Sequence, residues 1–269
     1  MKIIKQSAHI VKEWANMNLY ERCEFAGRIS HASEDKIKEG SAEEFVRRMV
    51  KLGHESVFEF ARIWIMIGKT FSPVNLRTIR ESLKEDSPSF FYADACALAI
   101  KYPSFFSDLE GKVHSEKIHG YDYEEDNKWI PVLITTNRAI SHQLVRYRKD
   151  VVYLQQSQRY VKFHDDIDFI SPDVYFGTDN KGKGYNMFRQ WIESMEGAEQ
   201  DYIYCLSEGY SAQAARLFLP NSTATKLIMY ASPDTWRHVF EQRISDKADP
   251  MIRELLEPLK EEFIKEGLL

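Results

Sequence analysis

The pattern of hydrophobic and polar residues over positions 41–53 predicts an amphipathic helix. Ser41 followed three residues later by Glu44 has the spacing of a capping box, a pattern typical of a helix start. Phe45, Met49 and Val50 then recur at helical spacing and predict an apolar stripe. Gly53 predicts the end of this helix, because glycine adopts the left-handed backbone conformation found after many helices.

Four other segments have the patterns of strands. Residues 56–67 (SVFEFARIWIMI) are rich in β-branched and aromatic residues, which predicts a strand buried on both faces. Residues 129–136 (WIPVLITT) and 225–230 are shorter apolar runs. Residues 151–161 alternate in polarity, and side chains of a strand alternate with period two. One face of that strand would carry Tyr153, Gln155, Ser157 and Arg159.

The C-terminal half predicts further helices between these strands. Asn137 is a suitable cap for a helix with Ile140, Leu144 and Tyr147 on one side. A helical region over residues 185–218 ends before a proline. Ser232-Pro233 is a good helix opening, and a last helix carrying Ile252, Leu255, Leu256 and Phe263 inward is bent or broken at Pro258.

The remaining stretches complete a prediction of the α+β class. Residues 167–184 have a proline and three glycines and predict a loop. Residues 71–128 contain scattered helical pattern and then an acidic stretch around residues 120–127 that predicts a solvated loop. The irregular mixture of strands and helices favours a central twisted, mixed or antiparallel sheet flanked by helices. We expect a single domain over residues 1–269.

Composition and charge restrict the class of protein. The chain has 269 residues, 43% of them hydrophobic, and a net charge of −5, which argues against a protein that coats nucleic acid. No apolar run approaches the ~20 residues of a membrane span, and the first residues turn polar too early for a secretory signal. The three cysteines, Cys23, Cys96 and Cys205, are too few and too scattered for a disulfide framework. We therefore expect a cytoplasmic protein with neither a membrane nor a nucleic-acid partner.

Arginines gather locally in this acidic chain. The sequence has no P-loop, no Gly-x-Gly-x-x-Gly after a strand and no His-Glu-x-x-His, and its histidines lack metal spacing, so no metal site is predicted. Arg146, Arg148 and Arg159 lie within fourteen residues, and Gln143, three positions before Arg146, is expected on the same helix face as Arg146. These arginines could form a solvated basic face or internal ion pairs. They could equally bind an anionic ligand, since the guanidinium fork suits phosphates and imide edges.

The arginine cluster resembles a known signature. RYRKDVVYLQQSQRY, residues 146–160, is similar to the Arg-His-Arg, seven residues, Ser-x-Arg motif of flavin-dependent thymidylate synthases, with Tyr147 replacing His and a spacer one residue longer. Three other segments resemble the same family in chain order. These are Arg28-Ile-Ser30, residues 53–59 (GHESVFE), and residues 216–221 (RLFLPN) followed by a helix that ends at Arg243. Residues 71–128 lie outside these segments, so the resemblance implies that they are an insertion in the domain.

The resemblance implies an enzyme, a methyltransferase of nucleotide biosynthesis. Members of the family methylate dUMP to dTMP with methylenetetrahydrofolate as carbon donor and FAD as the hydride source, which NADPH reduces. They need no cysteine nucleophile. Two alternatives remain open on the same fold, a pyrimidine-nucleotide hydroxymethylase and a non-catalytic nucleotide-binding protein.

The resemblance also assigns residues to the site. Arg243 would be catalytic and face the pyrimidine, where a fixed cation favours loss of the N3 proton; an arginine complementing the helix dipole is the alternative. The dUMP set is Gln143, Arg146, Ser157, Arg159, Arg216 and Arg243. The FAD set is Ser30, Ser56, Arg146, Tyr147, Arg148, Gln155, Ser232 and His238. His54, Glu59 and Tyr160 would lie near the folate and flavin rings.

The family's active sites are shared between the subunits of a homotetramer, which implies self-association here. Residues 155–159 would then come from a different subunit than some of their partners, and Trp64, Phe90 and Phe91 could serve interfaces. The chain departs from the family pattern at Phe60, where His is frequent, and at Ser232, where Asn is common. Residues 246–250 (DKADP) replace a stretch that is usually similar to Ala-Gln-Trp.

Overall fold

The computed structural model describes residues 1–60, 66–67, 70–71, 129–163, 166–177 and 181–269. Backbone contacts divide the chain into two compact units. The first comprises Met1–Lys12, Ile29–Ala32 and Asn127–Leu269, and the second comprises Glu13–Arg28 and Ser33–Asp126. Our expectation of a single domain over residues 1–269 stays a prediction, since this division describes contacts and not independent folding. Apart from Phe71, the predicted insertion at residues 71–128 lies outside the described residues, as do Trp64, Phe90 and Phe91.

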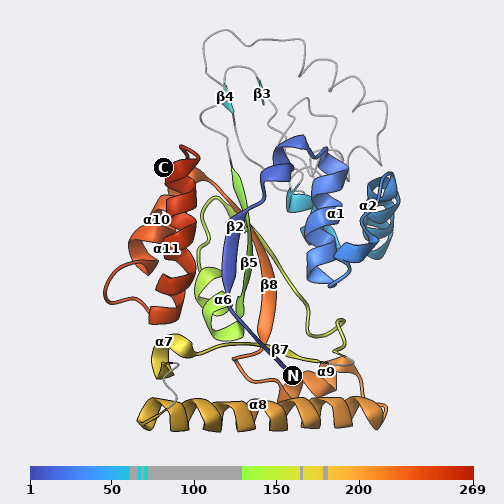
Figure 1. Ribbon diagram of the computed structural model, residues 1–269. Helices are drawn as coiled ribbons and strands as arrows, with labels where there is room; N and C mark the ends of the chain where they lie inside the picture. Colours follow the sequence, from blue (N-terminus) through green and yellow to red (C-terminus); the bar gives the residue numbers. More distant parts are fainter. Residues whose placement is uncertain (61–65, 68–69, 72–128, 164–165, 178–180) are drawn as a thin grey trace. The chain divides into compact units, whose positions relative to one another are not determined.

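A four-stranded antiparallel sheet is the centre of the first unit (Figure 1). Its strands, in spatial order, are β2 (Ser7–Ile10), β5 (Ile130–Asn137), β8 (Ala224–Ala231) and β6 (Val151–Gln155). In the β5–β8 register, Val132 lies opposite Met229 and Ile134 opposite Leu227, so these four side chains share one apolar face. The predicted strands at 129–136 and 225–230 are confirmed, and so is the α+β class with an antiparallel sheet.

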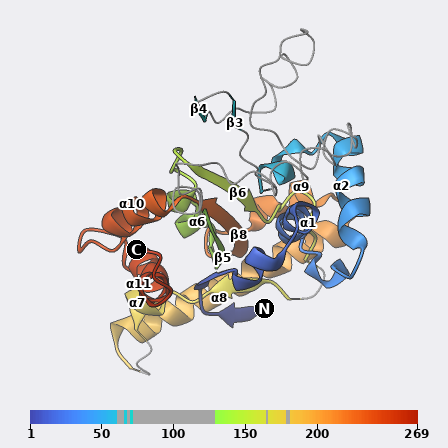
Figure 2. The ribbon, with the colours of Figure 1, turned by 90° about the horizontal axis from the view of Figure 1, so that it is seen from above.

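Helices cover that apolar face of the sheet. They are α6 (Arg138–Leu144), α10 (Pro233–Arg243) and α11 (Pro250–Lys265), and Figures 1 and 2 show α10 and α11 together on this side. Trp236, Phe240 and Phe263 pack with ring centroids 5.2–5.8 Å apart. The indole of Trp236 also donates to the carbonyl of Ile130 at 3.1 Å, which ties α10 to the sheet. The core is therefore built largely by the C-terminal helices.

The helix starts in this unit follow the sequence closely. The Asn137 side chain accepts from the Ile140 amide at 2.9 Å, and Ser232 accepts from the Thr235 amide at 3.2 Å, so both predicted caps are confirmed. The last helix, α11, continues through the exposed Pro258, so the helix is not broken there. Helix α6 ends at Leu144, earlier than predicted.

A second layer of the first unit contains a small parallel pair and a long helix. Strand β1 (Lys2–Ile4) pairs with β7 (Asp168–Ile170), and α7 (Asp173–Phe176) follows. The prediction of a continuous loop over 167–184 is therefore wrong, because pairing with the distant N-terminal strand makes β7. Helix α8 (Lys183–Ser207) runs across one end of the sheet and packs Met195 and Tyr202 against Ile167 and Phe169 (Figure 1). Helix α9 (Ala212–Ala215) and the 3₁₀ turn η4 (Arg216–Phe218) complete the predicted helical region.

The predicted strand over 151–161 is correct only in its first half. β6 ends at Gln155, and the chain then turns, with the Val161 amide bonded to the Ser157 carbonyl at 3.0 Å. The Ser157 hydroxyl accepts from the Arg159 amide at 3.2 Å and stabilises this turn. Ser157 and Arg159 therefore do not continue the strand face of Tyr153 and Gln155.

The second unit is helical in its described part. Its elements are η1 (Lys12–Asn16), α1 (Leu19–Ser30, whose last residues belong to the first unit), η2 (Glu34–Lys36), α2 (Ser41–Leu52) and η3 (Glu55–Phe60), and β3 (Met66–Ile67) pairs with β4 (Thr70–Phe71). The edges of the Phe25 and Phe60 rings meet Trp14 with centroids 6.1–6.2 Å apart. The buried Arg28 donates to Glu24 at 2.9 Å, and Ser41 donates to the other oxygen of Glu24 at 2.7 Å.

Two sequence predictions fail in the second unit. Residues 56–60 form the 3₁₀ turn η3, with Val57, Phe58 and Phe60 buried in a spacing that does not alternate, so the predicted strand is wrong there. The predicted helix α2 is present and ends at Gly53 with φ of 69°. Its capping box is wrong, however, because Gly40 occupies the cap position and the Ser41 hydroxyl binds Glu24 instead.

Candidate functional site

The half-buried Arg243, the last residue of α10, is held in place by neighbours on both sides. Its Nε donates to the hydroxyl of Tyr147 at 3.1 Å. Its Nη1 donates to Oε1 of Gln143 at 3.4 Å, and its Nη2 donates to the Gln143 carbonyl at 3.3 Å. A guanidinium has five N–H donors, and these bonds leave two of them for a ligand. Arg243 is thus an oriented cation with two N–H donors that no other described residue engages.

The aromatic ring of Tyr147 lies beside the guanidinium of Arg243. The guanidinium carbon lies 5.7 Å from the Tyr147 ring centroid, and the exposed His238 meets the same ring edge-on at 5.7 Å. Four residues predicted for the site, Gln143, Tyr147, His238 and Arg243, are therefore brought together by α6, the turn after it and α10. We call these four residues the Arg243 cluster.

Tyr153 of β6 holds the turn that carries Tyr147. Its hydroxyl donates to the Leu144 carbonyl at 2.9 Å and lies 3.5 Å from the Tyr147 carbonyl. Burial raises the pKa of Tyr153, so its hydroxyl stays protonated and remains a donor at neutral pH. The sheet therefore fixes the end of α6 and, through it, one side of the Arg243 cluster.

Arg146 and Arg148 lie on this turn but are exposed. Arg146 was expected on one helix face with Gln143, and this is wrong, because α6 ends at Leu144. Within the described part of the chain neither guanidinium makes a hydrogen bond or an ion pair. The interpretation of these two residues as internal ion pairs thus finds no support among the described residues.

A second group of predicted residues lies around the end of β6. Gln155 donates to the Ser141 hydroxyl of α6 at 2.8 Å and to Thr225 of β8 at 3.2 Å. The Ser157 amide donates to the carbonyl of the buried Ser30 at 2.9 Å. Ser30 and Ser157 are therefore neighbours, as a shared site requires.

The exposed end of this group carries a cation and an aromatic ring. Arg159 donates from Nε to Gln213 at 3.2 Å, and its guanidinium carbon lies 5.4 Å from the ring centroid of Tyr160. Tyr160, 60% exposed, stacks on His31 at 6.1 Å. We call Ser30, Gln155, Ser157, Arg159 and Tyr160 the β6-end group. Among the described residues, no hydrogen bond or ring contact joins it directly to the Arg243 cluster.

Arg216 has a neighbour that the sequence did not reveal. The Arg138 amide donates to the Asn221 carbonyl at 3.0 Å, which joins the start of α6 to the segment that begins at Arg216. Burial and the nearby Arg216 guanidinium both lower the pKa of Arg138. Two half-buried cations that repel each other form a suitable place for an anionic ligand. The signal in the sequence was an arginine directly after the helix cap Asn137, where the helix dipole disfavours a cation.

The other predicted residues are Ser232 and three residues of the second unit. Ser232 caps α10 and also contacts the Thr235 hydroxyl at 3.0 Å, so its hydroxyl is already engaged. His54, Ser56 and Glu59 belong to the second unit, where the His54 amide donates to Met49 at 3.0 Å after the end of α2. Their place beside a flavin or folate stays a prediction.

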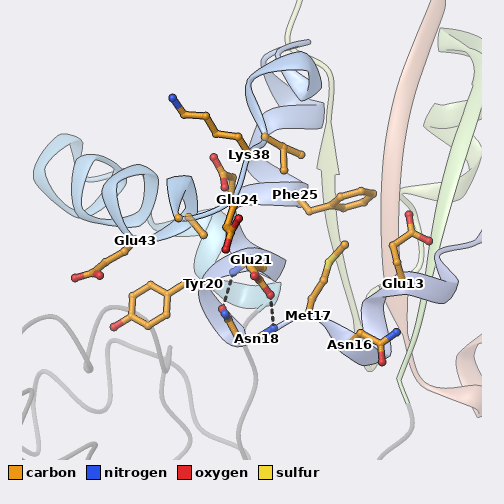
Figure 3. Close-up of a pocket in the computed structure, with 14 residues that line it drawn as sticks. Glu13, Asn16, Met17, Asn18, Tyr20, Glu21, Glu24, Phe25, Lys38 and Glu43 are labelled. Carbon is orange, nitrogen blue, oxygen red and sulfur yellow. Dashed lines mark hydrogen bonds between the residues drawn. The ribbon is translucent and has the colours of Figure 1, made fainter.

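The second unit contains a pocket of about 620 Å³ between η1, α1 and the start of α2 (Figure 3). Two of the carboxylates that line it, Glu21 and Glu24, have structural partners. Asn18 and Glu21 exchange hydrogen bonds of 2.8 and 3.0 Å that cap α1, and Glu24 binds Arg28 and Ser41. None of the predicted site residues lines this pocket, so the candidate site is the set of arginine-bearing groups in the first unit.

Among the described residues, no three His, Cys, Asp or Glu side chains converge in a way that could hold a metal ion. No helix in the described part combines the length and the apolar character that crossing a bilayer requires.

The fold and the arginine-bearing groups define an α+β protein with a site suited to an anionic ligand. Residues 130–266, just over half of the chain, match the sequence profile of the family described as thymidylate synthase complementing protein. The chain belongs to this family. The predicted resemblance to flavin-dependent thymidylate synthases is therefore confirmed, and the matched range contains both the Arg243 cluster and most of the β6-end group.

Curated relatives of the chain are named flavin-dependent thymidylate synthases. A flavin-dependent thymidylate synthase of Pyrococcus abyssi is 28% identical over 57% of this chain and 63% of its own length. One from Geobacter sulfurreducens is 36% identical over 44% of this chain and 49% of its own length. The chain thus spans between about half and just under two thirds of the curated relatives it matches.

A solved structure supports the fold. The UMP/dUMP methylase PolB from Streptomyces cacaoi, with 5-Br dUMP bound, superposes with a TM-score of 0.50. The alignment covers 98% of this chain and 93% of that one at 15% sequence identity. At this identity the likeness concerns the architecture alone.

Proposed function

We propose that the chain catalyses the reductive methylation of dUMP to dTMP, with methylenetetrahydrofolate as carbon donor, FAD as hydride carrier and NADPH as reductant of the flavin. The observation that carries this proposal is the oriented Arg243, held by Tyr147 and Gln143 with donors to spare. Family membership and the name of the curated relatives support the same reaction.

Arg243 would act on the uracil ring. Its two remaining N–H groups would face the imide edge, where negative charge develops as the N3 proton leaves. A fixed guanidinium lowers the pKa of that imide and makes C5 a better nucleophile toward the one-carbon unit. Because Gln143 and Tyr147 already orient the cation, little reorganisation is needed when the charge develops.

The phosphate of dUMP would bind to arginines of the first unit. Arg138 and Arg216 repel each other in the free protein, and a phosphate dianion between them would relieve this repulsion. Arg159 and Ser157 of the β6-end group, together with Arg146, would supply further donors. The nucleotide would thus neutralise several cations of an otherwise acidic chain.

The donor set around Tyr147 has the chemistry that FAD requires. The exposed Arg146 and Arg148 suit a pyrophosphate, and the rings of Tyr147 and His238 suit an isoalloxazine face. Gln155, Ser30, Ser232 and, from the second unit, Ser56 would add polar contacts. When bound, FAD supplies the hydride that completes the methyl group. His54, Glu59 and Tyr160 would lie toward the folate.

Self-association into a homotetramer with shared sites belongs to this proposal. Leu217 and Phe218, directly after Arg216, are 82% and 47% exposed, and an apolar surface beside a substrate arginine is typical of an interface that completes a site. The separate locations of the Arg243 cluster and the β6-end group also suit sites built from two subunits. A cytoplasmic location stays a prediction.

The test is an assay of the purified full chain. Incubation with FAD, NADPH, methylenetetrahydrofolate and dUMP should yield dTMP, and an absorbance spectrum between 350 and 500 nm should show bound flavin. UMP in place of dUMP measures the preference for the deoxyribose. Hydroxymethyl-dUMP as sole product would instead identify a hydroxymethylase. Binding of dUMP without turnover, unchanged by Tyr147→His, would identify a binding protein, and a chain that binds no FAD contradicts the proposal.

A further inference from the structure

Asp249 gathers donors from three elements around the start of α11. Its Oδ2 accepts from Nε2 of Gln143 at 3.1 Å. Its Oδ1 accepts from the Met251 amide at 2.9 Å, which caps α11, and from the hydroxyl of Tyr175 in α7. One oxygen therefore begins a helix, while the other contacts a residue of the Arg243 cluster.

We propose that Asp249 is a positioning residue, whose carboxylate sets the orientation of the Gln143 amide and thereby the pose of Arg243. This inference rests on the proposed function for its consequence in catalysis, but the positioning itself is a property of the protein alone.

The amide of Gln143 lies between a pure acceptor and a pure donor. A carboxylate can only accept, and a guanidinium can only donate. The amide satisfies both neighbours only when its NH₂ faces Asp249 and its oxygen faces Arg243. The reverse orientation would place oxygen against oxygen and NH₂ against guanidinium. Asp249 therefore determines which end of Gln143 Arg243 meets.

Tyr175 fixes the carboxylate in turn. Partial burial, together with the hydrogen bond to Asp249, raises the pKa of Tyr175 to about 12, so its hydroxyl remains a donor throughout the neutral range. The series Tyr175, Asp249, Gln143, Arg243 and Tyr147 is thus continuous from α7 to the turn after α6. The carboxylate cannot rotate away without losing its cap and this hydroxyl together.

Because one carboxylate oxygen of Asp249 caps α11 and the other contacts Gln143, a single substitution can remove the Gln143 contact and keep the cap. Asp249→Asn keeps a carbonyl oxygen for the cap, and asparagine is as good a cap as aspartate. It replaces the oxygen that faces Gln143 with NH₂, which forces the Gln143 amide to reverse or to lose its partner. Asp246→Asn is the matched control, because Asp246 is fully exposed in the same loop and its loss changes the net charge equally.

The first measurement needs no activity. Crystal structures of both variants should show the Arg243 Nε to Tyr147 Oη contact, 3.1 Å in the unsubstituted protein, broken in Asp249→Asn and kept in Asp246→Asn. A guanidinium that stays in place in Asp249→Asn overturns the proposal. If Asp249→Asn does not fold, Asp249→Ser keeps a capping oxygen without one for Gln143, and the same criterion applies.

The second measurement is a double-mutant cycle on dUMP affinity in the FAD-loaded protein. Asp249→Asn should weaken dUMP binding about tenfold with FAD affinity unchanged, and Gln143→Leu should remove that difference, because Asp249 acts through Gln143. An equal loss in the Gln143→Leu background would mean that the charge acts directly, which overturns the proposal. If the unsubstituted protein binds no dUMP, the proposed function fails, while the crystallographic criterion still decides the positioning role.

Discussion

The arginines around α6 fall into two groups that the fold treats differently. Arg243 is half buried, its guanidinium bonded to Tyr147 and Gln143 and supported by Asp249 behind them. Arg146 and Arg148, only a few residues after Gln143, are exposed and make no hydrogen bond or ion pair with the described residues. The same residue type is thus held rigidly in one place and left open in the other.

This difference corresponds to two kinds of task. A group that stabilises charge developing in a reaction acts best when it is already oriented before the substrate arrives. A group that binds a phosphate or a pyrophosphate can order when its ligand or a neighbouring subunit arrives, at a cost in side-chain entropy. We therefore expect removal of the held arginine itself to lower turnover most strongly, and substitutions on the open side to lower affinity with little change in turnover.

The largest effect is expected at the held arginine. Arg243→Ala should reduce kcat by ~10²–10³ while FAD still binds, since the loss concerns charge stabilisation at the reacting ring. Steady-state kinetics with flavin absorbance would measure both. Arg237→Ala, in the same helix but exposed and paired with Asp234, is the control. Turnover within severalfold of the unsubstituted enzyme would mean that Arg243 is misassigned.

The cation pair at the start of α6 should behave as part of the binding side. Arg138→Gln should raise the KM for dUMP about tenfold with little change in kcat, because a charged hydrogen bond to phosphate is lost in ground and transition state alike. Arg189→Gln, on the exposed face of α8, serves as the reference. A fall in kcat with unchanged KM would place Arg138 with Arg243 rather than with the binding residues.

Tyr153 links the two sides, because it holds the turn between them. Tyr153→Phe should lower the free energy of unfolding by about 1 kcal/mol, since the Leu144 carbonyl loses the shorter of its two hydrogen bonds and keeps only the one from the Tyr147 amide. Urea denaturation would measure this loss, with Tyr204→Phe on exposed α8 as the comparison. An unchanged midpoint would show that the hydroxyl does not fasten the turn.

The smallest effect is expected outside both groups, at the ion pair between Lys12 and Glu266. The hydrogen bond from Lys12 lowers the pKa of Glu266, so the pair stabilises the protein above the unfolded pKa of Glu266 and loses that contribution as pH falls through the folded pKa. The Tm difference between the unsubstituted protein and Glu266→Gln should therefore shrink on acidification from neutral pH to about pH 3. Glu261→Gln should show no such trend, and turnover should not change in either variant.

Local patterns predicted much of the first unit. The caps at Asn137 and Ser232 and the strands β5 and β8 were predicted closely, because each depends on a few neighbouring residues and on strong apolar runs. Residues 56–60 failed for the opposite reason. Their β-branched and aromatic composition favours a strand, but burial of Val57, Phe58 and Phe60 in the second unit made them a 3₁₀ turn.

The candidate site was predicted by residue type and order rather than by position. The signature around residues 146–160 identified the family, which the profile match confirmed. It did not reveal that a turn held by Ser157 follows the end of β6, because the alternating pattern of residues 151–161 hides this local hydrogen bond. It also did not reveal that Arg138 lies near Arg216, because that depends on a contact between segments that are distant in sequence.

The sequence by itself determined the family, the main helices and strands of the C-terminal half, and the set of arginines from which the site is built. Only the tertiary structure decided how those arginines differ. Asp249 and Gln143 are 106 residues apart, and Gln143 and Arg243 are 100 apart. Whether an arginine is held or open depends on which partners the fold places beside it, and no local pattern encodes a contact across such a distance.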